Sequence, residues 1–455
     1  MLRIAFGLFP LLFNLSLTPC RVPGVEEEVR CGRHEVYEDR AARNGRTIAL
    51  NVVVLPAKGP KAAPDPLVFL AGGGVAPATR YAGYFSRAFP ELRRERDIVL
   101  VDQRGTGGSN ALQCELSTDP TRADYRNKER FVAAVRRCRA AVETKADLRF
   151  YTTPMAMDDL DDVRAWLGYP RINLYGASYG TSAAMAYVRQ HGDHVRTVTL
   201  QGVVPLDVPM WLEVPRSSQQ ALEKVFAACA AQRQCHTAFP DLDREFASLL
   251  KRLAEKPVSV NTVTIDAEVL RDVVSHMLFG AERVHDLPLL IHLADQGDYG
   301  PLASKAASRG ESEIPPGIYL SIVCSELIPQ FDPAALPVAA AGTFMGSFRV
   351  ERDITACREW VRGSLPPKFH AAVKSDVPAL VMNGALDHLT PPSYGKHVAQ
   401  TLPNARHVVL PERGHNDVDP CVNAIIEHFI AAGNSSDLDT SCLEKSSPLT
   451  FALKP

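Results

Sequence analysis

The sequence lacks a strong charge of either sign. Its 455 residues carry a formal net charge of −2 at pH 7, with no marked basic surface or acidic tail. Charged stretches such as Glu91–Arg96 are interpreted as solvated helix faces. The sequence also contains no internal repeat and no low-complexity segment. We therefore expect no nucleic-acid partner, and the sequence leaves the oligomeric state open.

Long hydrophobic runs are absent after the first 20 residues, so we expect no stable membrane span. At the N-terminus, one early arginine precedes the apolar run in MLRIAFGLFPLLFNLSLTPC. This pattern resembles a secretory signal peptide, and residues 1–20 are assigned to it. Lipid attachment at Cys20 is a weaker alternative, because Pro19 fits a lipoprotein signal poorly. We expect a secreted or periplasmic protein.

No C-x-x-C pair occurs, and no histidine spacing fits a zinc site, so we expect no bound metal. The ten cysteines instead fall into neighbouring pairs. These are Cys20 with Cys31, Cys114 with Cys138, Cys229 with Cys235, Cys324 with Cys357, and Cys421 with Cys442. An even number at short separations favours disulfides formed in an oxidising compartment. Unrelated buried thiols are the alternative, since sequence does not fix connectivity.

Predicted strands and helices alternate in two parts of the chain. The apolar run at 66–74 ends in glycines, as expected of a buried strand, and 155–169 has the spacing of an amphipathic helix. Between these two parts the pattern is mostly helical and is broken by prolines. We predict an α/β fold with a mostly parallel central sheet covered by helices on both faces. Residues 21–205 and 376–455 would form this core, and 206–375 a mainly helical cap over the carboxyl ends of the strands.

A serine stands at the predicted corner between a strand and a helix. Gly176-Ala177-Ser178-Tyr179-Gly180 matches G-x-S-x-G, in which two glycines allow a strained turn that exposes the serine hydroxyl. The N–H groups of the following helix suit developing negative charge. A purely structural turn is the alternative, but the position favours Ser178 as a nucleophile.

A serine nucleophile requires a base and an acid, in the chain order serine, acid, histidine. Asp387 follows one late predicted strand and His415 follows the last one. His388 is a rival base, but adjacent residues in a loop rarely form the required hydrogen bond with each other. His407 is expected at the wrong end of the sheet. Ser178, Asp387 and His415 are therefore the candidate catalytic residues, with a turn-forming role as the alternative for Asp387.

The loop AGGG at Ala71–Gly74 follows an early predicted strand, where a loop that stabilises an oxyanion is expected. Glycines let backbone N–H groups approach a substrate closely. The candidate oxyanion hole combines the N–H of Tyr179 with that of Gly73 or Gly74. A tight turn without ligand contact is the alternative.

Together these motifs resemble the α/β-hydrolase superfamily, and within it the proline iminopeptidase and tripeptidyl aminopeptidase family of serine peptidases. The resemblance is carried by LAGGG, VDQRGTGGS, YGASYGT and LDHLTPP followed by GH, and it extends from about Cys31 to about Cys442. It implies the α/β-hydrolase fold, an acyl-enzyme mechanism and no cofactor. Asp102 and Arg104 of the DQRG element are expected to brace loops by ion pairing. The oxyanion loop lacks the histidine and proline of the HGGPG motif found in many relatives.

The resemblance also implies an acidic cap residue that binds the free amino group of a peptide. Glu326, in SIVCSELIPQF, is the candidate, because a disulfide at Cys324 would fix its position. A solvated cap glutamate is the alternative, and Glu311 and Glu313 are weaker rivals.

We therefore predict an exported serine aminopeptidase that releases N-terminal residues or short peptides. A carboxylesterase acting on small acyl esters would use the same groups and is the alternative. A non-catalytic binding protein with this fold is a third hypothesis, disfavoured because all three catalytic positions are filled.

Overall fold

The computed structural model describes residues 17–73, 75–117, 123–308, 314–445 and 447–454. Within them the main sheet has nine strands in the order β1-β2-β3-β5-β4-β6-β7-β10-β11. The pairs β1–β2, β2–β3 and β3–β5 are antiparallel, and all later neighbours are parallel. The strands are β1 (Thr18–Cys20), β2 (Val29–Tyr37), β3 (Thr47–Leu55), β4 (Leu67–Leu70), β5 (Ile98–Val101), β6 (Ile172–Ala177), β7 (Val195–Gln201), β10 (Ala379–Gly384) and β11 (Ala405–Leu410).

Both faces of this sheet are buried. Along β3, Val52 and Val54 join one apolar core, and Val53 and Leu55 join another on the opposite face. The alternation follows the two-residue period of a strand. Burial on both faces explains why the parallel strands appear in the sequence as continuous apolar runs.

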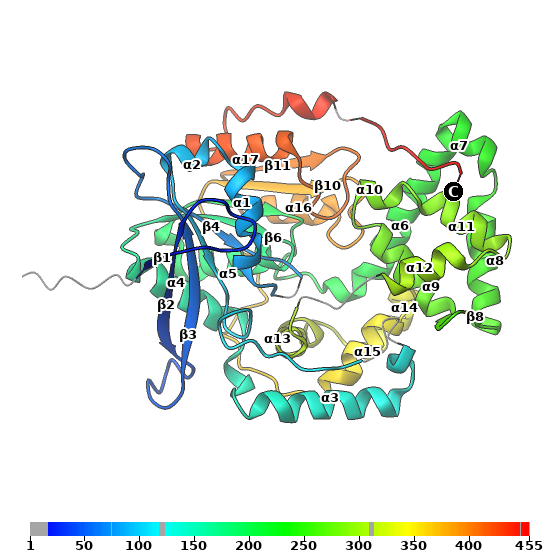
Figure 1. Ribbon diagram of the computed structural model, residues 1–455, viewed down its shortest axis with the longest axis horizontal. Coiled ribbons are helices and arrows are strands. Elements are labelled where there is room, and N and C mark those ends of the chain that lie inside the picture. The colour runs from blue at the N-terminus through cyan, green and yellow to red at the C-terminus, as the bar shows by residue number, and fades with distance from the viewer. Residues whose placement is uncertain (1–16, 74, 118–122, 309–313, 446, 455) are drawn as a thin grey trace, which may run out of the picture.

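Helices cover each face of the sheet (Figure 1). Side chains of α4, α5 and α16 complete the first core, and those of α1 and α17 complete the second. The helices of this part are α1 (Ala82–Ala88), α2 (Leu92–Glu95), α4 (Thr153–Trp166), α5 (Tyr179–His191), α16 (Pro392–Ala399) and α17 (Pro420–Ala432), with short 3₁₀ turns η1 (Ala78–Tyr81), η3 (Leu148–Phe150), η4 (Gly192–His194) and η8 (Ser441–Lys445). Local sequence fixes the ends of α17. Asp419 accepts a hydrogen bond from the Val422 N–H at 2.9 Å, and Gly433 ends the helix in the left-handed conformation.

A mainly helical insertion, defined as residues 206–375, separates β7 from β10. Its first group of helices, from Ala221 in α6 to α12, surrounds its own apolar core, and α13 and α15 pack against the first core of the sheet. The elements are α6 (Met210–Ala231), α7 (Arg233–Ala238), α8 (Leu242–Glu255), the antiparallel pair β8 (Val258–Val260) and β9 (Val263–Ile265), α9 (Ala267–Met277), α10 (Ala281–Val284), α11 (Leu287–Asp295), α12 (Gly300–Ala307), α13 (Pro316–Ile322), the π turn η5 (Val323–Leu327), η6 (Ile328–Gln330), η7 (Pro333–Ala335), α14 (Leu336–Ala340) and α15 (Phe348–Cys357).

Two segments outside the insertion pack with it. The helix α3 (Lys128–Glu143), which follows η2 (Ala123–Arg126), contacts α13 and α15 and lies below them in Figure 1. Near the C-terminus, Leu449 and Phe451 are buried in the core of α6–α12. Apolar side chains, not chain order, therefore decide which body these segments join.

Five disulfides join the neighbouring cysteine pairs that the sequence suggested. They are Cys20–Cys31, Cys114–Cys138, Cys229–Cys235, Cys324–Cys357 and Cys421–Cys442. Of the predicted signal segment, residues 1–16 lie outside the described residues, whereas Thr18–Cys20 pair with β2. Because its sulfur is bonded to Cys31, Cys20 is not free to carry a lipid, and that weaker expectation is wrong. None of the described helices has the length and apolarity of a membrane span.

Asp102, at the end of β5, braces the loops beside it through neutral groups. Its carboxylate accepts hydrogen bonds from the Thr79 N–H at 3.0 Å, the Asn51 side-chain amide at 2.9 Å and the Gly108 N–H at 2.9 Å. The 3₁₀ turn η1, which contains Thr79, follows the AGGG segment. The expectation that Asp102 acts through an ion pair is wrong, because backbone and amide donors satisfy its charge.

Arg104 does form the expected ion pair. Its guanidinium is buried and binds both carboxylate oxygens of Asp159 in α4, each at 2.7 Å. It also donates to the carbonyl oxygens of Glu38 and Phe150. One buried side chain thus connects the ends of β2, β5 and η3 to α4.

Replacing Arg104 with methionine should lower the free energy of unfolding by about 3 kcal/mol, because the buried Asp159 loses its bidentate partner and keeps only the single bond from Arg40 at 3.0 Å. Urea unfolding followed by far-UV circular dichroism measures the difference. Arg136→Met is the matched control. It removes an exposed ion pair with Glu359 and should have a much smaller effect. Equal losses in the two variants would contradict the role of Arg104.

Candidate active site

Ser178 lies at the turn between β6 and α5 in a backbone conformation that side chains rarely adopt, with φ 54° and ψ −122°. Gly176 and Gly180 make this turn possible. A Cβ atom on Gly176 would collide with the carbonyl oxygen of Gly180, and one on Gly180 with that of Leu70. The turn therefore has the strained geometry that presents a hydroxyl above the carboxyl edge of a sheet.

His415 and Asp387 follow neighbouring parallel strands. Asp387 comes three residues after β10 and His415 five residues after β11, so both loops reach the edge at which Ser178 lies. The Nε2 atom of His415 is 2.8 Å from Ser178 Oγ, and its Nδ1 atom is 2.9 Å from Asp387 Oδ2. The structure thus brings the three predicted residues into one hydrogen-bonded line. Such a line can transfer a proton from the serine to the imidazole.

The Asp387 carboxylate is buried and has further hydrogen bonds. Its Oδ1 atom accepts from the N–H groups of Leu389 and Thr390 at 3.0 Å and 2.8 Å, and the Thr390 hydroxyl donates to Oδ2 at 2.6 Å. Burial opposes ionisation, but the attraction of His415 and these hydrogen bonds hold the pKa of Asp387 below its usual value. The carboxylate therefore stays charged and fixed toward His415.

The two rival histidines lie elsewhere. His388 is buried, its Nε2 atom is 3.4 Å from Ser275 Oγ in α9, and burial lowers its pKa to about 3. His407 is within β11, with Nε2 at 3.1 Å from Asn383 Oδ1. Within the part of the chain that the structure describes, His415 is the histidine bonded to Ser178.

The predicted oxyanion groups lie on two sides of Ser178. Tyr179 is the first residue of α5, where backbone N–H groups have no acceptor within the helix. Gly72 approaches so closely that a Cβ atom on it would be 2.8 Å from the Cβ of Ser178, and Gly73 adopts φ 73°. Gly74 lies outside the described residues. The AGGG loop and the start of α5 thus flank the serine, as an oxyanion hole requires.

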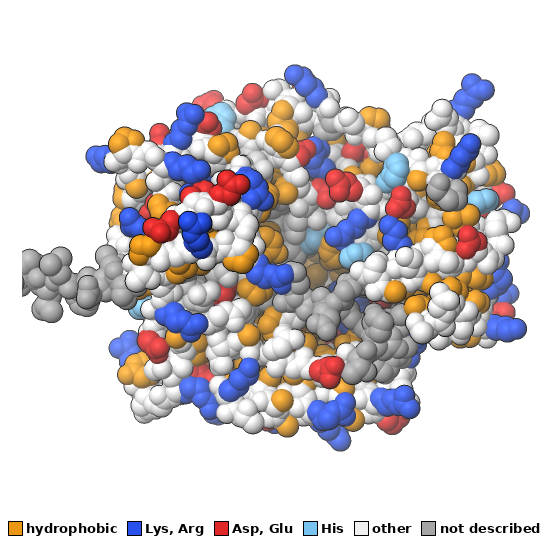
Figure 2. Space-filling model, in the orientation of Figure 1, with side chains coloured by type: hydrophobic (Ala, Val, Ile, Leu, Met, Phe, Trp, Pro, Cys, Tyr) orange, Lys and Arg blue, Asp and Glu red, His pale blue; other side chains and the backbone are white. Residues whose placement is uncertain are grey.

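The face of the molecule seen in Figure 2 is partly concave. Figure 2 shows a hollow near the centre of the face, between the core and the insertion, with histidine side chains visible at it. In the same view β10 and β11 point toward the insertion (Figure 1). The insertion reaches the oxyanion loop, because a Cβ atom on Gly73 would be 2.8 Å from Cδ1 of Ile314.

Glu326 lies in the π turn η5, a kind of turn often found at functional sites. Both of its oxygens are bonded to Thr153. Oε1 accepts from the Thr153 N–H at 2.6 Å and Oε2 from its hydroxyl at 2.7 Å. The Thr153 hydroxyl is also 2.6 Å from the Tyr179 hydroxyl. Glu326 thus reaches the residue after Ser178 through Thr153, and no hydrogen bond among the described residues joins it to Ser178 itself. Glu311 and Glu313 lie outside those residues.

Burial raises the pKa of Glu326 to about 7, although the hydrogen bonds from Thr153 act in the opposite direction. The disulfide Cys324–Cys357 lies two residues before it. The side chain is 2% exposed, so the solvated alternative for Glu326 is wrong.

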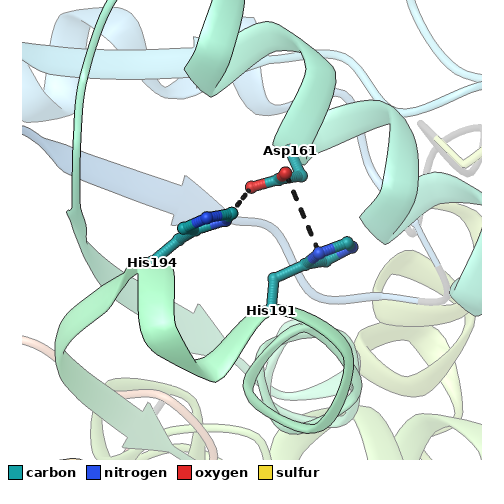
Figure 3. Close-up of side chains that lie close together, drawn as sticks. All are labelled: Asp161, His191 and His194. Atoms are coloured by element: carbon teal, nitrogen blue, oxygen red, sulfur yellow. Dashed lines mark hydrogen bonds and ion pairs between the residues drawn. The ribbon is translucent and has the colours of Figure 1, made fainter.

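Asp161, His191 and His194 form a group whose ligand atoms lie within 4.8 Å of one another, near enough to hold a metal ion (Figure 3). The Oδ1 atom of Asp161 is 2.8 Å from Nδ1 of His194, and it also accepts hydrogen bonds from Arg164 and Tyr187 at 2.7 Å each. The guanidinium charge at this oxygen opposes a second cation. The group lies at the opposite end of α5 from Ser178, so we interpret it as a structural ion-pair cluster.

Three residues that contact the candidate site residues were not predicted from the sequence. Thr390 follows Asp387 at the spacing of a side-chain-capped turn, which could have indicated it. Thr153 and Phe279, whose carbonyl accepts the His415 N–H at 2.8 Å, are remote in sequence from every motif and carry no local signal.

Comparison with known proteins links this geometry to one family. The chain matches the family described as alpha/beta hydrolase fold over residues 65–419. It is 22% identical to the tripeptidyl aminopeptidase of Streptomyces lividans over 92% of this chain and 84% of that protein. It is 28% identical to the serine protease Hip1 of Mycobacterium tuberculosis over 48% of this chain, and spans only 45% of that protein's length. A crystal structure of a proline iminopeptidase from Mycobacterium smegmatis superposes with a TM-score of 0.41 at 15% identity, covering 88% of this chain and 98% of that one.

Replacing Glu326 with glutamine should make the protein more stable than the wild type as pH rises. The folded-state pKa of about 7 is above the value of 4.5 for an ordinary glutamate. The contribution of Glu326 to stability is therefore full below pH 4.5 and is lost as pH rises through 7, by about 3 kcal/mol. Glutamine can keep both contacts to Thr153 without a charge.

Urea unfolding at pH 5 and pH 8 measures this effect as the change in the free energy of unfolding of Glu326→Gln relative to the wild type. Glu255→Gln, at the exposed end of α8, is the matched control. A Glu326→Gln variant whose relative stability is the same at both pH values would contradict the buried charge.

Proposed function

Since this chain belongs to the alpha/beta hydrolase fold family, we propose that it is a serine peptidase that releases residues or short peptides from the N-termini of peptides. The family match confirms the predicted fold class and the assignment to the hydrolases. The serine chemistry of this proposal rests on one observation, the hydrogen-bonded line from Ser178 through His415 to Asp387. The similarity to a tripeptidyl aminopeptidase over most of both chains supports a peptide substrate.

In the proposed mechanism the Ser178 oxygen attacks the carbonyl carbon of the substrate while His415 Nε2 accepts the hydroxyl proton. The charge that develops on the carbonyl oxygen is stabilised by the N–H groups of Tyr179 and Gly73, and one such donor contributes about 3 kcal/mol to the transition state. His415 then protonates the leaving amine and leaves an acyl-enzyme. In the second step His415 accepts a proton from water as the water attacks the ester carbonyl. His415 then gives this proton to the Ser178 oxygen, which restores the hydroxyl and releases the acid.

We propose that the protein acts outside the cytoplasm, either secreted or in a periplasm. Five disulfides within one chain support this location, because such bonds form and persist in oxidising compartments. The leader within residues 1–20 would end before Thr18, since Thr18–Cys20 pair with β2.

We further propose that the insertion is a cap that limits the active site to small or unfolded peptides. The contact between Ile314 and the AGGG loop supports this role. Glu326 remains the candidate for binding the free amino group, although a ligand would first have to displace Thr153 from its oxygens.

A carboxylesterase acting on small acyl esters is the second candidate. It is favoured by the hydrogen bonds between Glu326 and Thr153, because a carboxylate already satisfied by Thr153 does not present a free charge to an amine. The serine, histidine and oxyanion donors would serve either substrate, so the insertion decides between them.

Asp387→Asn should lower kcat by about 10⁴-fold, as in triads where this change fixes the wrong histidine tautomer. The Leu389 and Thr390 N–H groups donate to Oδ1, so the asparagine oxygen should stay there and its amino group should face His415. Nδ1 must then accept, which leaves a proton on Nε2 and no base for Ser178. Steady-state hydrolysis of p-nitrophenyl acetate measures the loss.

Asp437→Asn, at an exposed position near the C-terminus, is the matched control and should retain the wild-type kcat. If Asp387→Asn also retains it, another carboxylate orients His415.

The substrate class is tested with a tripeptide p-nitroanilide, its N-acetylated form and p-nitrophenyl butyrate, with Ser178→Ala as the blank. We expect cleavage of the free-amino peptide, at least 100-fold slower cleavage of the acetylated form, and no turnover by Ser178→Ala. Hydrolysis of the ester with neither peptide cut would favour the carboxylesterase. Turnover by purified Ser178→Ala would refute the assignment of the nucleophile.

A further inference from the structure

The insertion is bonded directly to the loop that carries His415. The turn Phe279–Ala281 joins α9 to α10 and lies beside residues 414–417, which follow β11. The backbone N–H of His415 donates to the Phe279 carbonyl at 2.8 Å. Asp417 Oδ2 accepts from the Gly414 N–H at 2.8 Å and from the Ala281 N–H at 3.1 Å, and so bridges the two segments. The histidine loop thus obtains hydrogen bonds from the insertion that the sheet does not supply.

The side chain of Phe279 contacts the imidazole itself. Its ring lies edge-on to the ring of His415, with centroids 5.5 Å apart and planes at 81°, and edge-on to the ring of His388 at 4.8 Å and 74°. Such arrangements are the preferred ones for aromatic pairs. Since Asp387 bonds one nitrogen of His415, the Phe279 ring adds a second restraint against rotation of the imidazole away from Ser178.

The two segments are packed without free space. A Cβ atom on Gly414 would be 2.6 Å from the Phe279 carbonyl oxygen, and one on Gly280 would be 2.6 Å from Asp417 Oδ1. Real Cβ contacts are not that short. A shift of the turn in the insertion must therefore move the loop of His415 as well.

The loop that carries Asp387 is held from the same side. The Ser217 hydroxyl in α6 donates to the His388 carbonyl at 2.6 Å, and the Lys224 ammonium, also in α6, donates to the Ala385 carbonyl at 2.8 Å. In α9, Ser275 Oγ is 3.4 Å from Nε2 of His388. The insertion therefore contacts both loops that complete the candidate active site.

We propose that the insertion positions the base of the reaction, with Phe279 as the residue that holds the His415 imidazole in line with Ser178 and Asp387. This inference rests on the proposed serine hydrolase chemistry and adds a role to the insertion besides controlling entry. If the insertion only controlled the entry of substrates, a change in it would alter the turnover of large substrates alone. If the insertion positions His415, a change in it alters the turnover of every substrate, including one too small to touch the insertion.

The test compares Phe279→Ala with the wild type on p-nitrophenyl acetate and on a tripeptide p-nitroanilide. Active sites are counted with a fluorophosphonate that labels Ser178. We expect kcat per labelled site to fall 10-fold to 100-fold on both substrates, as misplacement of a catalytic group does, with KM for the acetate unchanged within 2-fold. Phe279→Tyr, which retains the ring, should restore kcat. Phe279→Leu replaces Phe279→Ala if the alanine variant does not fold.

Phe239→Ala is the matched control, because it removes a buried aromatic ring from the insertion that packs on His292, away from both loops. It should lower the melting temperature and leave kcat per labelled site unchanged. The proposal is overturned if Phe279→Ala slows only the peptide, if it slows neither substrate, or if Phe239→Ala lowers kcat as much.

A readout without turnover separates this proposal from the proposed function. The proton on Nδ1 of His415, bonded to Asp387, is expected to give a downfield resonance in the ¹H NMR spectrum. Phe279→Ala should broaden or remove it, and Phe239→Ala and Phe279→Tyr should keep it. A folded wild type that neither hydrolyses the two substrates nor reacts with the fluorophosphonate would refute the serine chemistry, and the resonance would then decide the role of Phe279 alone.

Discussion

The backbone of Ser178 is the constraint on which the rest of the structure depends. Its positive φ can be held only if the second-to-last residue of β6, Gly176, is a glycine and α5 packs close to β4 through another, Gly180. This turn fixes the hydroxyl at the carboxyl edge of the sheet. The parallel register of β7, β10 and β11 then brings the loops of Asp387 and His415 to the same edge. The hydrogen-bonded line is therefore a consequence of strand direction as much as of the three residues.

Loops at such an edge need support, and the structure provides it from two sides. On the side of the sheet, Asp102 satisfies the N–H groups of neighbouring loops, and Arg104 ties three segments to α4. On the other side, the insertion forms a hydrogen bond with the loop of His415 through Phe279. Residues of α6 and α9 in the insertion form hydrogen bonds with the loop of Asp387. The burial of Leu449 and Phe451 in the core of the insertion connects it again to the end of the chain. Each of these contacts reduces the freedom of a loop that regular secondary structure does not hold.

The features of the candidate site that depend on local chain geometry could be predicted from the sequence. The turn around Ser178, the positions of Asp387 and His415 after late strands, and the five cysteine pairs all involve neighbours in sequence or the order of strands. Contacts between residues that lie far apart in the sequence could not be predicted. Asp102 was expected to form an ion pair, but its donors come from three segments far apart in the sequence, which are β3, η1 and the loop of Gly108. Nothing near Thr153 or Phe279 marks their contacts with Glu326 and His415, because those contacts exist only after the insertion has packed. The helix α3 likewise joined the insertion through its apolar face, which the order of the chain does not indicate.

The state of Glu326 bears on the choice between peptide and ester. A site that recognises an ammonium group gains specificity from a carboxylate whose partner is missing until the ligand binds. Here both oxygens of Glu326 are bonded to Thr153, and burial favours the neutral acid, with a pKa of about 7. An amine could be bound only by exchanging the Thr153 bonds for its own and by drawing the carboxyl group into its charged form. Because the Thr153 hydroxyl also contacts the Tyr179 hydroxyl, that exchange would change the contacts of the residue proposed to supply an oxyanion donor. Amine binding at Glu326 would therefore be coupled to the reacting carbonyl through Thr153, whereas an ester would leave this chain of hydrogen bonds intact.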